Sequence, residues 1–367
     1  MITIIAEYIW IGIGDDCNVH SKTRILSGVS NILDISNFPN WDFDGSSTGH
    51  SVSTINSEII LKPCFICNNP FVIPNKYGET GEIRDVIVLC STYFPDGITP
   101  TESNNRHIAD LTMKKTQEVC PWFGLEQEYF LCNDKLNKSP VGFDSNQITT
   151  PTTKHYCGNG NEGQLGLGLT RPIADEHLRA CLMAGIKISG MNAEVAPGQW
   201  EFQIGPCEGI SQGDHMWVAR FLLVRVAEKY GLTVNFLPKV LPDQFNGSGC
   251  HANYSTRLMR NPTQDERGLN GIDHINNAIK KLSNNHGKHM ELYGVGNDKR
   301  MTGKNETASF NTFTSGVATR HTSVRIGTAT YTNKCGYFED RRPSSNCDPY
   351  LVTSLIQQTC TYQEDNH

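Results

Sequence analysis

Apolar and polar residues alternate along two stretches of this chain, a pattern that is typical of half-buried β-strands. Residues 122–131 read Trp-Phe-Gly-Leu-Glu-Gln-Glu-Tyr-Phe-Leu, and residues 199–204 read Gln-Trp-Glu-Phe-Gln-Ile, with Glu201 on the polar side. Side chains two residues apart on a strand share a face. Glu126 and Glu128 of the first stretch should therefore point in the same direction.

Other segments show the features of helices. Residues 172–185 begin with a proline, place acidic residues in the first turn and end on a glycine, which is the usual order of helix signals. Residues 214–230 and 272–292 carry apolar stripes typical of helices that pack on a core. We also predict helices over residues 101–118 and 350–358.

The N-terminal part of the chain favours strands instead. We predict strands over residues 6–12, 27–35 and 85–90, joined by polar turns. A Pro-Asp-Gly sequence follows the last of these strands, and longer helical patterns begin after it. A chain of 367 residues is long enough for two domains. We place them at residues 1–93 and 94–367.

Charge and composition narrow the possible functions. The formal net charge is -6, and the lysines and arginines form no basic runs. Nucleic acid and membrane surfaces are therefore not expected partners. With no apolar run of transmembrane length and no secretory leader, the sequence predicts a cytoplasmic protein. The 13 cysteines are expected to stay reduced, and the lone Cys64–Cys67 pair lacks the second pair that a zinc site needs.

One glycine motif resembles a dinucleotide-binding fingerprint. Gly158, Gly160 and Gly163 have the required spacing. However, no apolar strand leads into the motif, and no acidic residue marks the end of a following strand. We therefore interpret residues 133–170 as a polar surface loop.

The glutamates on the predicted strands suggest a metal site. Two carboxylates about 4 Å apart repel by roughly 4 kcal/mol at an effective dielectric constant of ~20, and a cation would offset this repulsion. Glu194, His251 and Glu339 lie in similar strand-like or glycine-hinged settings. Each residue alone is more typical of a solvated face, an ion pair or a buried histidine, but their repetition favours one site. Oxygen ligands with a single imidazole favour Mg²⁺ or Mn²⁺ over Zn²⁺, with roughly two or three ions matching the charge.

Several longer segments also resemble one known family. They are Trp41-Asp-Phe-Asp-Gly-Ser-Ser-Thr, Trp122-Phe-Gly-Leu-Glu-Gln-Glu-Tyr, Gln199-Trp-Glu-Phe-Gln-Ile-Gly-Pro-Cys-Glu-Gly-Ile-Ser, Asn246-Gly-Ser-Gly-Cys-His and Gly336-Tyr-Phe-Glu-Asp-Arg-Arg-Pro-Ser-Ser-Asn-Cys-Asp-Pro. Through these segments the chain resembles eukaryotic-type (type II) glutamine synthetase along nearly its whole length.

The resemblance implies an α+β fold, with an N-terminal β-grasp domain and a catalytic domain whose antiparallel sheet forms a funnel flanked by helices. It implies ATP-dependent ligation of ammonia to the γ-carboxylate of L-glutamate through γ-glutamyl phosphate, giving L-glutamine, ADP and phosphate. It also implies a homo-oligomer, a decamer of two pentameric rings, with each active site between two subunits.

The resemblance also implies roles for residues at matching positions. One metal would be held by Glu128, Glu194 and Glu201, and a second by Glu126, His251 and Glu339. ATP would be bound by Trp122, Glu126, Glu201, Asn253, Ser255, Arg325 and Tyr337. Glutamate would be bound by Asn246, Gly247, Arg300, Arg320 and Arg341. The implied catalytic residues are Asp44 as the base for ammonium, Glu306 on a mobile flap, and Arg320 at the transferring phosphoryl group.

Two segments depart from the family pattern, and the N-terminus is shorter than the family's by about a helix, so ring assembly could differ. The flap reads Gly-Lys304-Asn305-Glu306-Thr, where the family usually has Gly-Phe-His-Glu-Thr, and residues 242–245 read Pro-Asp-Gln-Phe in place of Pro-Gly-Asn-Trp. Two alternatives to an active glutamine synthetase are a non-catalytic relative that keeps the fold and a ligase for a larger amine such as a polyamine. The metal-binding positions argue against the first, and Asp44 with Glu306 favours ammonia over a larger amine.

Overall fold

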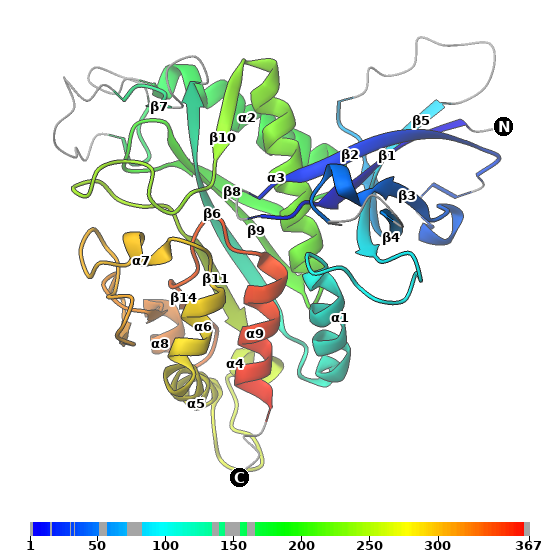
Figure 1. The fold of residues 1–367 in the computed structure, drawn as a ribbon. Helices are drawn as coiled ribbons and strands as arrows, with labels where there is room; N and C mark the ends of the chain where they lie inside the picture. The colour runs from blue at the N-terminus through cyan, green and yellow to red at the C-terminus, as the bar shows by residue number, and fades with distance from the viewer. Residues whose placement is uncertain are drawn as a thin grey trace.

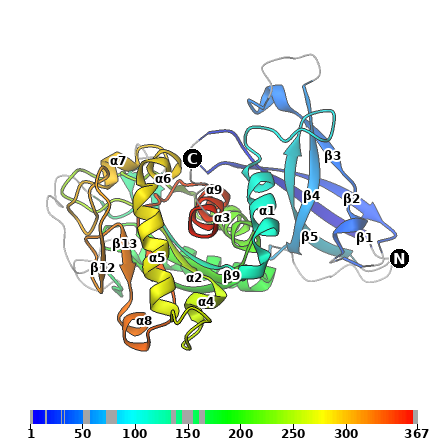
Figure 2. The ribbon, with the colours of Figure 1, turned by 90° about the horizontal axis from the view of Figure 1, so that it is seen from below.

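The computed structural model describes residues 3–14, 17–29, 31–32, 34–50, 57–71, 83–133, 139–143, 155–159 and 166–362. The strands form two sheets, and the helices pack mainly with the second sheet (Figure 1). Seen from below, the N-terminal sheet stands to one side of the second sheet and its helices (Figure 2). This arrangement confirms the predicted α+β class.

The first sheet is built from the N-terminal residues. Its strands are β1 (Thr3–Ile11), β2 (Val19–Ser27), β3 (Trp41–Asp44), β4 (Glu58–Asn68) and β5 (Ile83–Tyr93). The spatial order is β2-β1-β5-β4-β3, with β1 and β5 parallel and the other neighbours antiparallel. The two parallel strands in the middle carry long buried runs, as expected of strands covered on both faces. This order agrees with the predicted β-grasp arrangement.

One strand predicted in this region is wrong. The described part of residues 27–35 contains the end of β2, a turn and the start of a short 3-10 helix, η1 (Ile35–Asn37). The strand beside β1 is instead the more polar β2, an edge strand with one exposed face. Val29 and Ile32 pack, partly buried, against the small core of this sheet. Their apolar character therefore reflects packing outside a strand.

The second sheet carries the strands predicted from alternation. Its strands in the described residues are β6 (Trp122–Asn133), β7 (Ser139–Pro140), β8 (Ile188–Ala193), β9 (Gln199–Glu208), β10 (Leu232–Asn235), β11 (Cys250–Ser255), β12 (Ser315–Val317), β13 (Val324–Ile326) and β14 (Phe338–Asp340). The main path runs β12-β13-β14-β11-β6-β9-β8, antiparallel except for the β12–β13 pair, and β7 and β10 pair with β6. β6 and β9 confirm the two predicted strands.

The helices that the structure describes are α1 (Asn105–Lys115), α2 (Leu167–Ala184), α3 (Ser211–Lys229), α4 (Arg257–Arg260), α5 (Gly271–Asn284), α6 (His286–Leu292), α7 (Asn297–Arg300), α8 (Thr328–Asn333) and α9 (Pro349–Thr361). All the predicted helices are present, but three differ clearly in extent, and one of these, α1, is shorter at both ends than the predicted 101–118. α2 begins ahead of Pro172, because Leu167 and Thr170 are buried and the Thr170 hydroxyl accepts a hydrogen bond from Trp200. The helix predicted over residues 272–292 is divided into α5 and α6 at Asn285.

α3 lies against one face of the second sheet, with α2 and α9 beside it (Figure 2). On β6 this covered face includes Phe123 and Gln127, both buried. The Oε1 atom of Gln127 accepts hydrogen bonds of 2.9 and 2.6 Å from the guanidinium of Arg220 on α3, so this buried amide is paired. Glu126 and Glu128 belong to the opposite face of β6, which α3 does not cover.

Three remaining predictions concern segments away from the site. Of the glycine motif, Gly158 is described, whereas Gly160 and Gly163 lie outside the described residues, as does most of segment 133–170. All 13 cysteines are free thiols, as predicted. Within the described ranges, no helix combines the length and apolar character that crossing a membrane requires.

Candidate active site

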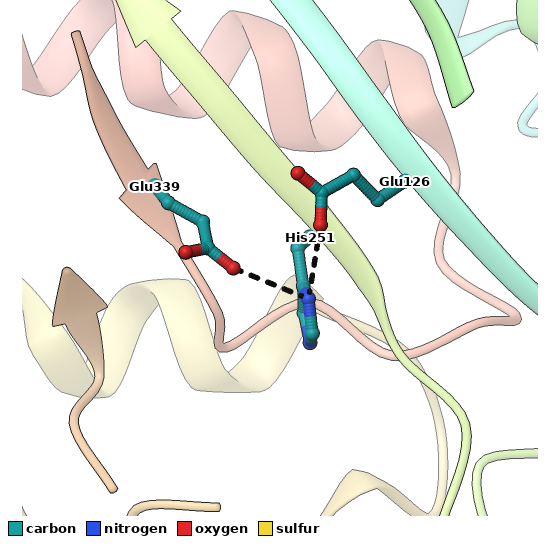
Figure 3. Close-up of side chains that lie close together, drawn as sticks. All are labelled: Glu126, His251 and Glu339. Carbon is teal, nitrogen blue, oxygen red and sulfur yellow. Dashed lines mark ion pairs between the residues drawn. The ribbon is translucent and has the colours of Figure 1, made fainter. Parts of the chain in front are cut away.

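Three strands bring Glu126, His251 and Glu339 together (Figure 3). The register pairs His251 of β11 with Glu126 of β6, and β14 lies on the other side of β11. Nδ1 of His251 lies 3.5 Å from Oε2 of Glu126 and 3.4 Å from Oε1 of Glu339. Burial, followed by the charge of Arg341, holds the pKa of His251 below its ordinary value. The imidazole is therefore neutral at pH 7 and able to act as a metal ligand.

Glu128, Glu194 and Glu201 form a second group. Glu128 and Glu201 are direct cross-strand partners on β6 and β9, and Glu194 follows the end of β8. Like charges placed directly opposite each other destabilise a sheet. Burial raises the pKa of Glu194 to about 7, and burial together with the nearby carboxylates raises that of Glu201 to about 8. The same causes raise the pKa of Glu128. These three side chains repel one another unless a cation joins them.

Both groups fit a hard divalent cation. In each group, one ligand atom from every residue lies within 4.8 Å of the others. A single ion with bonds of about 2.0 to 2.6 Å to oxygen can bridge ligands at that spacing. Five carboxylates and one imidazole are a donor set for magnesium-like ions, since a zinc site would carry more nitrogen or sulfur. The structure thus assembles, as two adjacent groups, all the residues predicted to bind metal.

A pocket of about 190 Å³ opens beside these groups, and it brings together segments that are far apart in the chain. Its wall includes Asn246, Gly247, Arg300, Glu306, Arg320, Arg325 and Arg341. Nη1 of Arg320 lies 3.2 Å from Oε2 of Glu306. Arg325 and Arg341 both pair with Glu339, at 3.3 and 2.6 Å. The guanidinium groups needed to bind an anionic substrate are therefore present.

Arg300 and Gly247 pack against each other at this pocket. Arg300 is only 5% exposed, and its Nη2 donates to the backbone carbonyl oxygens of residues 341–343. Burial lowers the pKa of Arg300 to about 10. A Cβ atom at position 247 would collide with the Arg300 side chain and with the carbonyl oxygen of Pro238. Glycine is therefore required at 247 for Arg300 to reach the pocket.

A second, larger pocket of about 620 Å³ adjoins the first, since Glu126 lines both. The predicted nucleotide residues Trp122, Asn253, Ser255 and Tyr337 all line it. Trp122 and Tyr337 are 41% and 52% exposed, so they offer open aromatic surface to a base. Nδ2 of Asn253 donates to Oε1 of Glu126 at 2.7 Å. Glu201 and Arg325, also predicted to bind the nucleotide, line the smaller pocket instead.

Arg260 and Tyr156 are among the pocket residues that the sequence pattern did not predict. Arg260 of α4 lies over the Trp122 ring, with its guanidinium carbon 4.0 Å from the ring centroid, and lines the larger pocket. Tyr156 lines the smaller pocket, and the centroid of its ring lies 5.9 Å from the guanidinium carbon of Arg320. No local signal marks either residue, because each reaches its pocket only through the tertiary fold.

Asp44 is not brought into either pocket. It is exposed at the end of β3, in the first sheet, whereas the other predicted site residues belong to the second sheet and its connections. Its carboxylate accepts hydrogen bonds from the amide and hydroxyl of Ser46, at 3.0 and 2.7 Å. The hydroxyl bonds of Ser46 and Ser57, followed by the amide bond, lower the pKa of Asp44. The residue is therefore an ionised acceptor at the protein surface.

Comparison with known proteins gives the family. The family model for the glutamine synthetase catalytic domain matches residues 102–359. The chain belongs to the glutamine synthetase family. It is 46% identical over 358 residues to glutamine synthetase cytosolic isozyme 1-1 of Oryza sativa subsp. japonica, covering 97% of this chain and 93% of that protein.

Two further glutamine synthetases are similar to this chain to the same degree. Glutamine synthetase cytosolic isozyme 1-3 of Arabidopsis thaliana is 46% identical, over 97% of this chain and 94% of its own length. Glutamine synthetase of Neurospora crassa is 45% identical, over 97% and 91%. These relatives confirm the predicted family. The span that matches the glutamine synthetase catalytic domain contains both metal-ligand groups and both pockets, whereas Asp44 precedes it.

Proposed function

We propose that this protein is a glutamine synthetase, which uses ATP to join ammonia to the γ-carboxylate of L-glutamate and releases L-glutamine, ADP and phosphate. The observation that carries the proposal is the position of the two groups of metal-ligand residues. They lie where a pocket with aromatic walls adjoins a pocket lined by arginines, in a chain of this family. We assign ATP to the larger pocket and glutamate to the smaller one.

We propose Mg²⁺ or Mn²⁺ as the metal, with roughly two or three ions in each site. The group of Glu126, His251 and Glu339 would hold the ion at the nucleotide phosphates. The second group, around Glu128, would hold the ion nearer glutamate and ammonia. When bound, such ions neutralise the charge that develops on phosphate oxygens. The five glutamates and the neutral histidine of the two groups would supply the ligands for these ions, and neither group contains a cysteine.

The first step activates glutamate. A carboxylate is a poor electrophile, so its γ-oxygen first attacks the terminal phosphorus of ATP, and ADP leaves. Phosphoryl transfer depends on in-line positioning and on neutralising oxygen charge. We assign Arg320 and Arg325 to the transferring group. Arg300, Arg341 and Asn246 would hold the glutamate, since a planar guanidinium can bind a carboxylate through two hydrogen bonds.

The second step needs neutral ammonia, because ammonium has no lone pair. We propose that Asp44 of a neighbouring subunit accepts the proton, since Asp44 is exposed on the first sheet and lies outside the pockets of its own chain. Ammonia then attacks the acyl carbon and phosphate leaves. This assignment requires a homo-oligomer with shared sites, and we propose a decamer of two five-membered rings. We also propose that it works in the cytoplasm, like the relatives named as cytosolic isozymes.

A biosynthetic assay with hydroxylamine in place of ammonia tests the proposed reaction. Purified protein of determined mass in solution should form γ-glutamyl hydroxamate from glutamate, hydroxylamine and ATP when Mg²⁺ or Mn²⁺ is present. No product from a metal-replete, oligomeric preparation would reject the proposal. A preference for polyamines over ammonium would indicate the larger-amine ligase. Calorimetry that detects neither Mn²⁺ nor ATP binding would indicate a non-catalytic relative.

Glu306→Ala tests the flap. The variant should bind ATP normally, because Glu306 lines only the smaller pocket, but turnover should fall about a hundredfold, since the carboxylate that closes over glutamate is lost. Steady-state rates measure the turnover, and calorimetry measures nucleotide binding in the same preparation. Turnover near that of the unmodified protein would reject the assignment of Glu306.

A further inference from the structure

The flap, residues 302–309, is a short hairpin with an unusual tip. A backbone bridge closes its base, and the amide of Thr307 donates to the carbonyl oxygen of Lys304 at 3.1 Å. Between them, Asn305 and Glu306 have φ values of 49° and 62°. Positive φ at both central positions defines a type I′ turn, the turn that best fits a two-residue hairpin loop. The flap therefore presents Glu306 from the tip of a tight turn.

The two residues at the tip differ in how well they suit this backbone. Asparagine adopts positive φ more readily than most residues, because its short polar side chain is tolerated there. A long side chain such as that of Glu306 is disfavoured in the same region. Such a conformation persists only where the surroundings hold it, and it is concentrated at functional sites. Contacts beyond the turn must therefore keep Glu306 in place.

Those contacts come from two sides. On one side, two arginines of the pocket bind Glu306. Arg320 contacts the Glu306 carboxylate at 3.2 Å, and Arg341 donates to the Glu306 backbone carbonyl oxygen at 3.3 Å. On the other side, Nδ2 of Asn305 donates to the carbonyl oxygens of Asp243, at 2.9 Å, and Phe245, at 3.2 Å. An amide nitrogen has two hydrogens, so these two bonds use its full donor capacity.

The segment that accepts these bonds is itself well fixed. The amide of Phe245 donates to the carbonyl oxygen of Pro242 at 2.9 Å, and the ring of Phe245 is buried. The ammonium of Lys239 donates to the Phe245 carbonyl oxygen at 2.6 Å. Asn246 and Gly247 follow directly and line the smaller pocket. A bond to this segment therefore fixes the flap against the wall of the glutamate site.

We propose that Asn305 is a positioning residue, a latch that holds Glu306 over the pocket by donating both amide hydrogens to the 242–245 segment. The two segments that depart from the family pattern are the ones that this latch joins. Asn305 acts through the flap, since its hydrogen bonds go to backbone carbonyl oxygens and leave Glu306 to face the substrate. The inference rests on the proposed function, because a closed flap matters only if an acyl phosphate must be kept from water.

Asn305→Gly isolates the latch. Glycine adopts positive φ freely, so the turn is kept and only the side-chain donors are lost. Loss of two hydrogen bonds should raise the KM for glutamate about tenfold. Because a looser flap admits water, the variant should also release more phosphate for each glutamine formed. A merely structural role for Asn305 would leave this ratio unchanged.

Trypsin provides a second measurement that does not depend on activity. It cleaves after lysine, and Lys304 lies directly before the latch residue. Local opening controls cleavage of a folded protein. Cleavage after Lys304 should therefore be several times faster in Asn305→Gly than in the unmodified protein, with equal melting temperatures showing that the fold is intact.

Lys304→Ala is the matched control for the kinetic measurements. Its side chain is exposed on the same turn, so the KM for glutamate and the phosphate ratio should stay unchanged. Unaltered KM, phosphate ratio and trypsin cleavage in Asn305→Gly would overturn the latch, even in an active enzyme. An unmodified protein without ligase activity would count against the proposed function, and the trypsin comparison would still test the latch.

Discussion

Glu128→Gln should nearly abolish metal-dependent ligation while making the metal-free protein more stable. Glutamine keeps the shape of the side chain and an oxygen that can accept the 2.9 Å hydrogen bond from the Gly249 amide. It removes one of the three charges that would hold the metal with Glu194 and Glu201. Charge stabilisation by such a metal contributes several kcal/mol, so kcat/KM should fall about a thousandfold.

The gain in stability has the same origin as the loss of activity. Without metal, burial and repulsion by nearby carboxylates raise the pKa of Glu128 and of Glu201, which face each other across β6 and β9, so keeping them ionised at neutral pH costs stability. Removing one charge should raise the free energy of unfolding of the metal-free protein by about 1 to 2 kcal/mol. Mn²⁺ should stabilise the unmodified protein by binding its folded form, and should stabilise the variant much less. Thermal denaturation with a chelator and with Mn²⁺ measures both effects.

Glu266→Gln provides the control. Glu266 is exposed in the loop before α5, so this change should alter neither activity nor stability in either condition. Two results would contradict the prediction for Glu128→Gln. One is a variant that Mn²⁺ stabilises as strongly as the unmodified protein. The other is a metal-free variant that is less stable than its parent, which would mean that the three carboxylates do not repel.

The strands that carry the site could be predicted because each has one buried and one polar face. On β6, burial of Phe123 and Gln127 leaves Glu126 and Glu128 together on the open face, as alternation predicts. Alternation alone could not divide these two glutamates between different groups. That division depends on the register of β6 with β9 and β11, which joins residues far apart in the chain.

The pocket residues that escaped prediction have contacts that are long-range in the sequence. Arg260 contacts Trp122, and Asn305 contacts Asp243, through tertiary packing that no local pattern encodes. The strand predicted over residues 27–35 was wrong for a related reason, since apolar residues can pack on a core without joining a sheet. Local patterns therefore predict the elements, whereas the joining of elements at the pockets needs the structure.

Asp340→Asn should lower the free energy of unfolding by about 3 to 5 kcal/mol, the largest effect on stability that we expect. Asp340 and Arg342 are both 0% exposed, and their side chains approach to 2.7 Å. The variant keeps the shape of the side chain but leaves the guanidinium without a counter-charge in the protein interior. Chemical denaturation of the metal-free protein measures the loss.

Tyr293 and His289, which lie beside this pair, carry no negative charge that could replace that of Asp340. Tyr293 donates a 2.9 Å hydrogen bond to Asp340, and the buried His289 lies beside Tyr293. Burial lowers the pKa of His289 to about 3, so the ring is neutral. Burial by itself would raise the pKa of Asp340, but the charge of Arg342 outweighs it and holds that pKa below its ordinary value. The carboxylate is thus the counter-ion for Arg342.

Two comparisons separate the effect of the buried charge from other causes. The pair Lys114 and Asp110 also lies close, at 2.6 Å, but its side chains are 71% and 27% exposed. Asp110→Asn should therefore change the stability by less than about 0.5 kcal/mol. The double variant Asp340→Leu, Arg342→Met removes both buried charges and should recover most of the stability that Asp340→Asn loses. If the double variant were as unstable as Asp340→Asn, lost packing rather than an unpaired charge would explain the effect.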